Sequence, residues 1–251
     1  MTVNPIADRA FGSQAEAYER GRPGWPADTV ASLLERWGAR DVVDLAAGTG
    51  KLTRLLIEHA DVTAIEPVDG MRAVLARQVP QARVLSGTAE AIPLPDASVD
   101  AVFVAEAFHW FDLDRAPAEI ARVLRPAGHL AVLFNQLDTD EPWFADLHEI
   151  VMARRLPGPQ MPHTVPWREA IEAQFGALSD EEGPHEHVVS RDEQVAQIAS
   201  FSSIGGLPQA QREAALAECL AVLERYGVDR VVQAYRAQIT IAQKRAGESA
   251  G

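Results

Sequence analysis

The chain has 251 residues, of which 47% are hydrophobic and 24% are charged, and its formal net charge is −13 at pH 7. These proportions are ordinary for a globular protein, and the length suffices for one α/β domain with an elaboration. The negative charge argues against nucleic acid as a partner, because phosphate binding relies on Lys and Arg displacing counterions.

Predicted helices and strands alternate over the first half of the chain. A helix begins at Pro26 and ends before Gly38. Five short apolar strands are expected at 42–46, 62–66, 83–87, 101–105 and 129–134, and the helices between them at 52–59, 71–78 and 115–124. A Pro/Gly turn at 125–128 ends the last of these helices and leads into the fifth strand. The alternation predicts a Rossmann-like, doubly wound, mostly parallel α/β sheet.

The pattern changes after residue 135. We expect helices at 141–155, 167–175, 192–201 and 209–226, and a loop with four prolines at 156–166. Candidate strands at 185–189 and 230–242 would complete a seven-stranded sheet. The fold class is therefore a Rossmann-like sheet with a helical insertion after strand five.

The run VVDLAAGTGKLT at 42–53 places a carboxylate at the end of an apolar strand, just before a glycine-rich turn. Gly48 and Gly50 permit backbone conformations that a Cβ would obstruct, and they let a ligand approach the main chain. Strand, turn and helix together form a cradle for a nucleotide-like ligand. Asp44 would repel a pyrophosphate, whereas it would attract an ammonium and a sulfonium. S-adenosylmethionine carries both cations, so the charge favours a methyl donor over NAD.

A second acid stands where a nucleotide-binding βαβ unit requires one. Glu66 ends the next apolar strand, 22 positions after Asp44, where such an acid binds ribose hydroxyls. Two competing motifs do not match. A P-loop would need a glycine at Leu45 and a Ser or Thr at Leu52, and the dehydrogenase fingerprint would need a glycine at Thr53.

On these residues the chain resembles the class I S-adenosylmethionine-dependent methyltransferases, particularly their small-molecule branch. Asp44, Gly48 and Gly50 match the family's acid-x-Gly-x-Gly-x-Gly motif, and Ala46 stands at the first glycine. The resemblance implies one domain with three parts. Residues 1–40 form an N-terminal segment covering the cofactor, 41–135 form the cofactor-binding core, and 136–251 hold a substrate-covering insertion and the final strands.

The resemblance and the motifs together give a set of cofactor-binding candidates. Those expected around the methionine portion, the ribose and the adenine are Asp44, Ala46, Gly48, Thr49, Gly50, Glu66, Pro67, Met71, Ala89 and Glu90. In the family, strand four runs along the methyl-bearing end of the cofactor. Ala105 and Glu106 would flank that end.

Acceptor-binding candidates follow the same strand. The resemblance implies that Phe108, His109 and Trp110 border the acceptor, and aromatic faces can attract a sulfonium and exclude water. His109 is the candidate general base, because its unperturbed pKa lies near neutrality. Core packing is the alternative for the aromatic residues.

The N-terminal stretch at 11–26 is a second resemblance, carried by Phe11, Ala15, Tyr18 and Arg22-Pro23. It implies a segment that folds over the cofactor. Arg22 would pair with the methionine carboxylate, because its planar fork can bind both oxygens, and Tyr18 would lie near the transferred methyl and the acceptor. A surface amphipathic helix is the alternative.

Other residues indicate whether a metal site, a disulfide or a membrane segment is expected. His185 and His187 alternate on a possible strand, but no Cys or acid cluster completes a metal site, so we expect no metal. The single Cys219 excludes a disulfide framework. No run reaches membrane-spanning length, and the N-terminus has no apolar segment typical of a signal peptide, so a cytoplasmic protein without membrane partners is expected. The oligomeric state stays open.

The sequence therefore predicts methyl transfer from S-adenosylmethionine to a small molecule. Oxygen, carbon and carboxylate acceptors all remain open. Base N-methylation of nucleic acid is disfavoured by charge and because AEAF stands where such enzymes carry an Asn/Asp-Pro-Pro-aromatic motif. The rival hypotheses are an NAD-dependent oxidoreductase and a non-catalytic, regulatory S-adenosylmethionine-binding protein.

Overall fold

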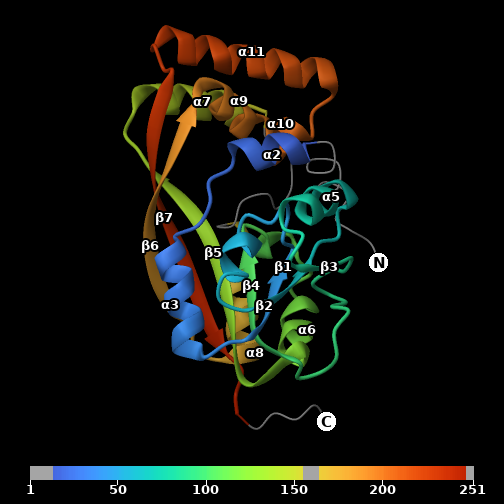
Figure 1. Ribbon diagram of the computed structural model, residues 1–251. Coiled ribbons are helices and arrows are strands. Elements are labelled where there is room, and N and C mark those ends of the chain that lie inside the picture. Colours follow the sequence, from blue (N-terminus) through green and yellow to red (C-terminus); the bar gives the residue numbers. More distant parts are fainter. Residues whose placement is uncertain (1–13, 155–163, 247–251) are drawn as a thin grey trace.

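The computed structural model describes residues 14–154 and 164–246. Seven strands form one sheet in the order β3-β2-β1-β4-β5-β7-β6 (Figure 1). They are β1 (Asp41–Leu45), β2 (Asp61–Ile65), β3 (Arg83–Leu85), β4 (Val99–Ala105), β5 (Leu124–Asp138), β6 (Ser179–Ser190) and β7 (Arg230–Gln243). Only β7 runs antiparallel to its neighbours, β5 and β6. The predicted Rossmann-like, mostly parallel seven-stranded sheet is confirmed.

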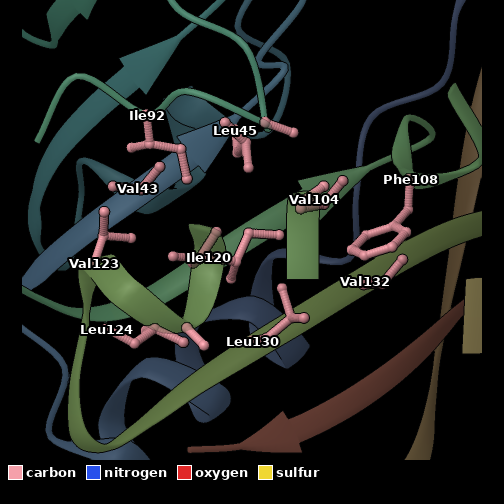
Figure 2. Packing of buried hydrophobic residues seen from close by; sticks show 14 of the residues in the cluster. Val43, Leu45, Ile92, Val104, Phe108, Ile120, Val123, Leu124, Leu130 and Val132 are labelled. Carbon is pink, nitrogen blue, oxygen red and sulfur yellow. The ribbon is translucent and has the colours of Figure 1, made fainter. Parts of the chain in front are cut away.

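Helices cover both faces of the sheet because neighbouring residues of each strand point to opposite sides. Val42 packs in a buried cluster with α3 (Ala27–Trp37) and α4 (Thr53–Leu56), and α5 (Asp69–Gln78) covers β2 on the same face. Val43 packs on the other face with α6 (Ala116–Val123) and α8 (Trp167–Phe175). Figure 2 shows the packing on that second face, in which Val43, Val104 and Ile120 meet. A parallel sheet buried on both faces explains why its strands are continuous apolar runs.

A second layer of helices lies beyond the carboxyl ends of β1 and β4, at the top of Figure 1. We call it the cap, and it consists of α7 (Pro142–Met152), α9 (Arg191–Ala199), α10 (Ser202–Gly205) and α11 (Gln209–Arg225). The cap has its own apolar core, which includes Trp143, Ile204 and Leu223. The N-terminal helix α2 (Ala15–Gly21) packs against α9. Among the described residues, no helix is both long and apolar enough to cross a membrane.

Three elements differ from the sequence-based expectation. β5 already begins at Leu124, so the expected Pro/Gly turn at 125–128 is an irregularity within this strand, where Ala127 has φ 64°. β6 covers Ser179–Ser190 rather than 185–189, because an edge strand with alternating exposed acids lacks a continuous apolar run. The helices after strand five do not form one insertion, because β6 separates α7 and α8 from α9, α10 and α11. The loop expected at 156–166 lies mostly outside the described residues.

The junction of α2 with α9 has no space for a side chain at Gly21. A Cβ there would lie 2.1 Å from the Gln197 backbone nitrogen, whereas a Cβ at Gly24 would meet nothing within 4 Å. We expect Gly21→Ala to lower the free energy of unfolding by about 1–3 kcal/mol, as overpacking does, because α2 must move away from the cap. Gly24→Ala is the matched control, and urea denaturation of both variants measures the difference. Equal stability of the two variants would contradict the close packing of α2 on α9.

Candidate active site

The turn after β1 has the backbone geometry that its glycines predict. Ala46, Gly48 and Gly50 all have positive φ, at 58°, 58° and 90°. Gly50 is also constrained by packing, since a Cβ there would lie 2.5 Å from the Leu75 Cδ1. An alanine in the left-handed region costs roughly 1–2 kcal/mol, so Ala46 stores strain at the position where the family motif has a glycine.

Asp44 lies at the end of β1 with its side chain only 1% exposed. One carboxylate oxygen, Oδ2, accepts a hydrogen bond of 2.6 Å from the Thr53 hydroxyl. The other, Oδ1, is buried and has no hydrogen-bond partner among the described residues. Burial raises the pKa of Asp44 to about 7, and the Thr53 bond only partly opposes this rise. A buried carboxylate with an unpaired oxygen is costly unless a cation meets it.

Glu66 connects the ends of β1 and β2. Its Oε2 accepts a hydrogen bond from the Gly48 N–H and its Oε1 accepts one from the Val68 N–H, both at 2.8 Å. Burial raises the pKa of Glu66 to about 7 despite these two bonds. The carboxylate therefore fixes the glycine-rich turn and also faces the cavity beside it.

The larger of two adjoining cavities has a volume of about 590 Å³ and lies along the ends of β1, β2 and β4. Most of the predicted cofactor residues line it. They are Tyr18, Ala46, Gly48, Glu66, Pro67, Met71, Ala89, Glu90, Ala105 and Glu106. Residues from five distant stretches of sequence thus meet at one edge of the sheet.

The smaller cavity, of about 320 Å³, lies between this edge and the cap. Its wall includes the predicted residues Asp44 and Arg22, together with aromatic side chains from the cap. Five residues line both cavities: Tyr18, Ala46, Gly48, Ala105 and Glu106. We call these five residues the junction.

Two cations line the smaller cavity. The Arg22 Nε donates a hydrogen bond of 2.8 Å to the Ser200 hydroxyl, and its guanidinium lies over the rings of Tyr18 and Phe201. Lys51 follows the glycine-rich turn, and burial lowers the pKa of its ammonium. Arg22 therefore connects the segment after α2 to the cap, at the point where both border the cavity.

A closed ring of four hydrogen bonds supports the cap side of the smaller cavity. Gln197 donates to the Tyr235 hydroxyl at 2.8 Å, and this hydroxyl donates to Gln233 at 3.2 Å. Gln233 donates to Gln194 at 2.5 Å, and Gln194 donates back to Gln197 at 2.9 Å. All four side chains are buried. The ring fixes Gln197 and Tyr235, which line the cavity, in one orientation.

Four predicted site residues lie away from both cavities. Phe108 is fully buried in the core against Phe111 and Trp167 and lines neither cavity. His109 is 7% exposed, and its loss of hydration lowers the pKa to about 4, so the structure does not favour it as the base. Thr49 and Gly50 shape the turn instead of lining a cavity.

Trp110, predicted on the acceptor side, lines the larger cavity instead. The short 3₁₀ helix Phe108–Trp110 causes these differences, because it rotates successive side chains to different sides. Phe11, part of the N-terminal resemblance, lies outside the described residues.

Sequence reasoning missed most of the smaller cavity. Its unpredicted lining includes Trp25, Lys51, Asn135, Phe144, Gln197, Phe201 and Tyr235. Asn135 alone carried a usable signal, because it follows the fifth apolar run at the ligand-binding edge of the sheet. The cap residues carried none, since aromatic residues on helices are also typical of an ordinary core. Within residues 14–154 and 164–246, no cluster of three His, Cys, Asp or Glu side chains could hold a metal ion.

The raised pKa of Asp44 predicts a pH-dependent stability for the ligand-free protein. Its folded pKa of about 7 exceeds the ordinary 3.8, so the folded state binds more protons than the unfolded state between these values. The stability contributed by this group is thus lost as pH rises towards 7. We expect Asp44→Asn to gain stability relative to the unchanged chain from pH 5 to pH 8, measured by urea denaturation. The exposed Asp61→Asn is the control, and a constant difference for Asp44→Asn would contradict the raised pKa.

Comparisons with known proteins agree with this geometry. A family model described as a methyltransferase domain matches residues 43–132. An uncharacterized methyltransferase of Mycobacterium tuberculosis H37Rv is 51% identical over 143 residues, which cover 57% of this chain and 58% of that relative. An uncharacterized methyltransferase-like protein of Schizosaccharomyces pombe is 32% identical over 84% of both chains.

Solved structures share the fold. One assigned as a type II methyltransferase from Anaeromyxobacter dehalogenans has 25% identity and a TM-score of 0.66 over 90% of this chain and 98% of its own. The Haemonchus contortus phosphoethanolamine N-methyltransferase 2, in complex with S-adenosyl-L-methionine, has 16% identity and a TM-score of 0.54 over 98% of this chain and 60% of its own. The chain therefore belongs to the methyltransferase family and has the Rossmann-like fold of its class I members.

Proposed function

We propose that this protein transfers a methyl group from S-adenosylmethionine to a small-molecule acceptor. The observation that carries the proposal is the unpaired Oδ1 of Asp44, buried in the wall of the smaller cavity. Taking an ionised carboxylate out of water is favourable only when a cation or hydrogen-bond donors meet it. S-adenosylmethionine offers an ammonium and a sulfonium and no phosphate that this charge would repel.

The larger cavity suits the adenosine part of this cofactor. Glu66 has lone pairs left for ribose hydroxyls after binding two backbone amides, and Pro67 lies next to it. Met71, Ala89 and Glu90 provide an apolar surface with one acid for the adenine. A structural neighbour that was solved with S-adenosyl-L-methionine bound supports the choice of this cofactor. When bound, the cofactor supplies an electrophilic methyl group on its sulfonium.

The N-terminal segment supports the methionine part. Arg22 lines the same cavity as Asp44, so a ligand there can place a carboxylate on one and an ammonium on the other. Tyr18 belongs to the junction and covers both cavities from α2. These contacts support the proposed role of residues 1–40 as a cofactor-covering segment, as far as the described residues reach.

The cap supports a small acceptor. The smaller cavity holds about 320 Å³, and Trp25, Phe144 and Phe201 give it aromatic walls. Such walls exclude water, which competes with the acceptor as a nucleophile, and they hold the acceptor in place. The strongly acidic chain disfavours nucleic acid in this position. We therefore assign residues 136–251 to the substrate-covering part.

Isothermal titration calorimetry with S-adenosylmethionine tests the proposal. Loss of a charge-assisted bond costs about 1.5–3 kcal/mol, so Asp44→Asn should weaken binding about 10- to 100-fold while the fold is kept. Asp61→Asn is the control, because Asp61 is exposed at the start of β2 and lines neither cavity, and this variant should bind like the unchanged chain. Unchanged affinity of Asp44→Asn would remove the charge argument on which the proposal depends.

Two further measurements separate the rival functions. NAD should give no binding heat, and tight NAD binding would favour an oxidoreductase. Transfer of isotopic label from methyl-labelled S-adenosylmethionine to small metabolites of a cell extract should be catalysed by the unchanged chain. Cofactor binding without any transfer of label would favour a non-catalytic regulatory protein.

A further inference from the structure

Glu106 occupies a singular position at the junction of the two cavities. Among the five described residues that line both, it alone carries a carboxylate. In the proposed binding mode the cofactor crosses this junction, with its adenosine in the larger cavity and its methionine part in the smaller one. The sulfonium joins these two parts, so Glu106 lies close to the place where an acceptor atom in the smaller cavity would receive the methyl group.

β5 holds Glu106 by both its main chain and its side chain. The Glu106 N–H donates to the Leu133 carbonyl at 2.9 Å, and the carboxylate Oε1 accepts from the Asn135 N–H at 2.7 Å. The residue has φ 55°, which is strained for a residue with a side chain. Its second oxygen, Oε2, has no hydrogen-bond partner among the described residues. A strained backbone with one oxygen fixed and the other unused is typical of a functional group.

We infer that Glu106 accepts the proton of the acceptor during methyl transfer, and that the acceptor is a hydroxyl, an amine or an activated C–H rather than a carboxylate. The inference rests on the proposed function and deepens it. The acceptor atom X forms a bond to the methyl carbon while the carbon–sulfur bond breaks and its electron pair stays on sulfur. The X–H proton moves to Glu106 Oε2, so a cationic donor and an anionic carboxylate become a neutral thioether and a neutral acid.

The other polar groups nearby are unsuited to this task. The pKa of Tyr18, which shares the junction, is raised to about 12 by burial, so its hydroxyl keeps its proton at neutral pH. His109 lines neither cavity. Lys51 lines the smaller cavity but does not belong to the junction. Glu106 is the group that combines basicity with the right place.

The charged surroundings of Glu106 come from three elements. Arg22, after α2, lowers the pKa of its carboxyl, and burial raises it more strongly, so the net shift is upward. Tyr18 from α2 and Tyr235 from β7 face it as neutral phenols at physiological pH, because burial raises their pKa values and the charge of Glu106 adds to the rise. An upward shift brings the pKa of a carboxyl closer to physiological pH, where a general base is more effective.

The same charge selects the chemical class of the acceptor. A carboxylate acceptor has no proton to lose and would be repelled by Glu106 at short range. A neutral hydroxyl, amine or carbon acid gains a hydrogen-bond acceptor there and becomes more nucleophilic as its proton leaves.

Glu106→Gln tests the role without disturbing the fold, because the amide oxygen can still accept the Asn135 bond. Glu58→Gln, an exposed glutamate outside both cavities, is the control. The variant should bind S-adenosylhomocysteine, whose thioether is neutral, as tightly as the unchanged chain does. With S-adenosylhomocysteine bound, it should also gain stability relative to the unchanged chain as pH rises above 4.5, because it cannot ionise. Weaker binding of S-adenosylhomocysteine would make Glu106 a cofactor ligand and overturn the inference.

Labelled methyl transfer to a metabolite extract then tests the acceptor class. Mild alkali releases methyl esters as volatile methanol but leaves methyl ethers, methylamines and C-methyl groups intact. We expect alkali-stable label, reduced at least about 100-fold by Glu106→Gln, as for loss of a general base. Alkali-labile label, or undiminished transfer by the variant, would overturn the inference and leave the proposed function standing. No transfer by the unchanged chain would instead remove the proposed function.

Discussion

The structure depends on an uncompensated negative charge at the end of β1. Thr53 satisfies one oxygen of Asp44 and leaves the other buried without a partner among the described residues. Such an arrangement destabilises the empty protein, because burial disfavours the ionised form and raises the pKa of the group. The Thr53 hydroxyl, at the start of α4, holds the carboxylate in place through Oδ2. Under the proposed function, a cationic ligand would meet the second oxygen.

Two more carboxylates extend this principle along the edge of the sheet. Glu66 ends β2 and Glu106 follows β4, and each binds a backbone amide of a neighbouring element. Burial raises the pKa of all three acids. Carboxyl ends of parallel strands meet at one edge, so acids that are far apart in sequence act on one ligand. Their differing partners separate their roles: Glu66 shapes the turn, whereas Glu106 keeps a free oxygen at the junction.

The sequence predicted the sheet and many of the residues that line the larger cavity, because both follow from local patterns. Apolar runs that end in Asp44 and Glu66 mark strand ends directly, and positive φ at Gly48 and Gly50 matches their residue type. Local patterns failed where the direction of a side chain depends on the rotation of a short helix or on packing between distant segments. Phe108 and His109 turn away from the cavities within one 3₁₀ turn, and the cap residues meet only after β6 and β7 bring distant helices together. No spacing of residues in the sequence predicts that Gln197 contacts Tyr235.

Many residues of the larger cavity could be predicted from sequence patterns, whereas the cap residues of the smaller cavity could not, and this difference has a physical cause. In the proposed reaction every acceptor would meet the same methyl donor, so the edge of β1, β2 and β4 would keep one charge pattern. The acceptor would instead meet the aromatic walls of the smaller cavity, and these depend on helix packing rather than on strand-end motifs. The family model covers only the first side of this division, since it ends at residue 132. Under the proposed function, acceptor choice would therefore reside in the cap and at Glu106.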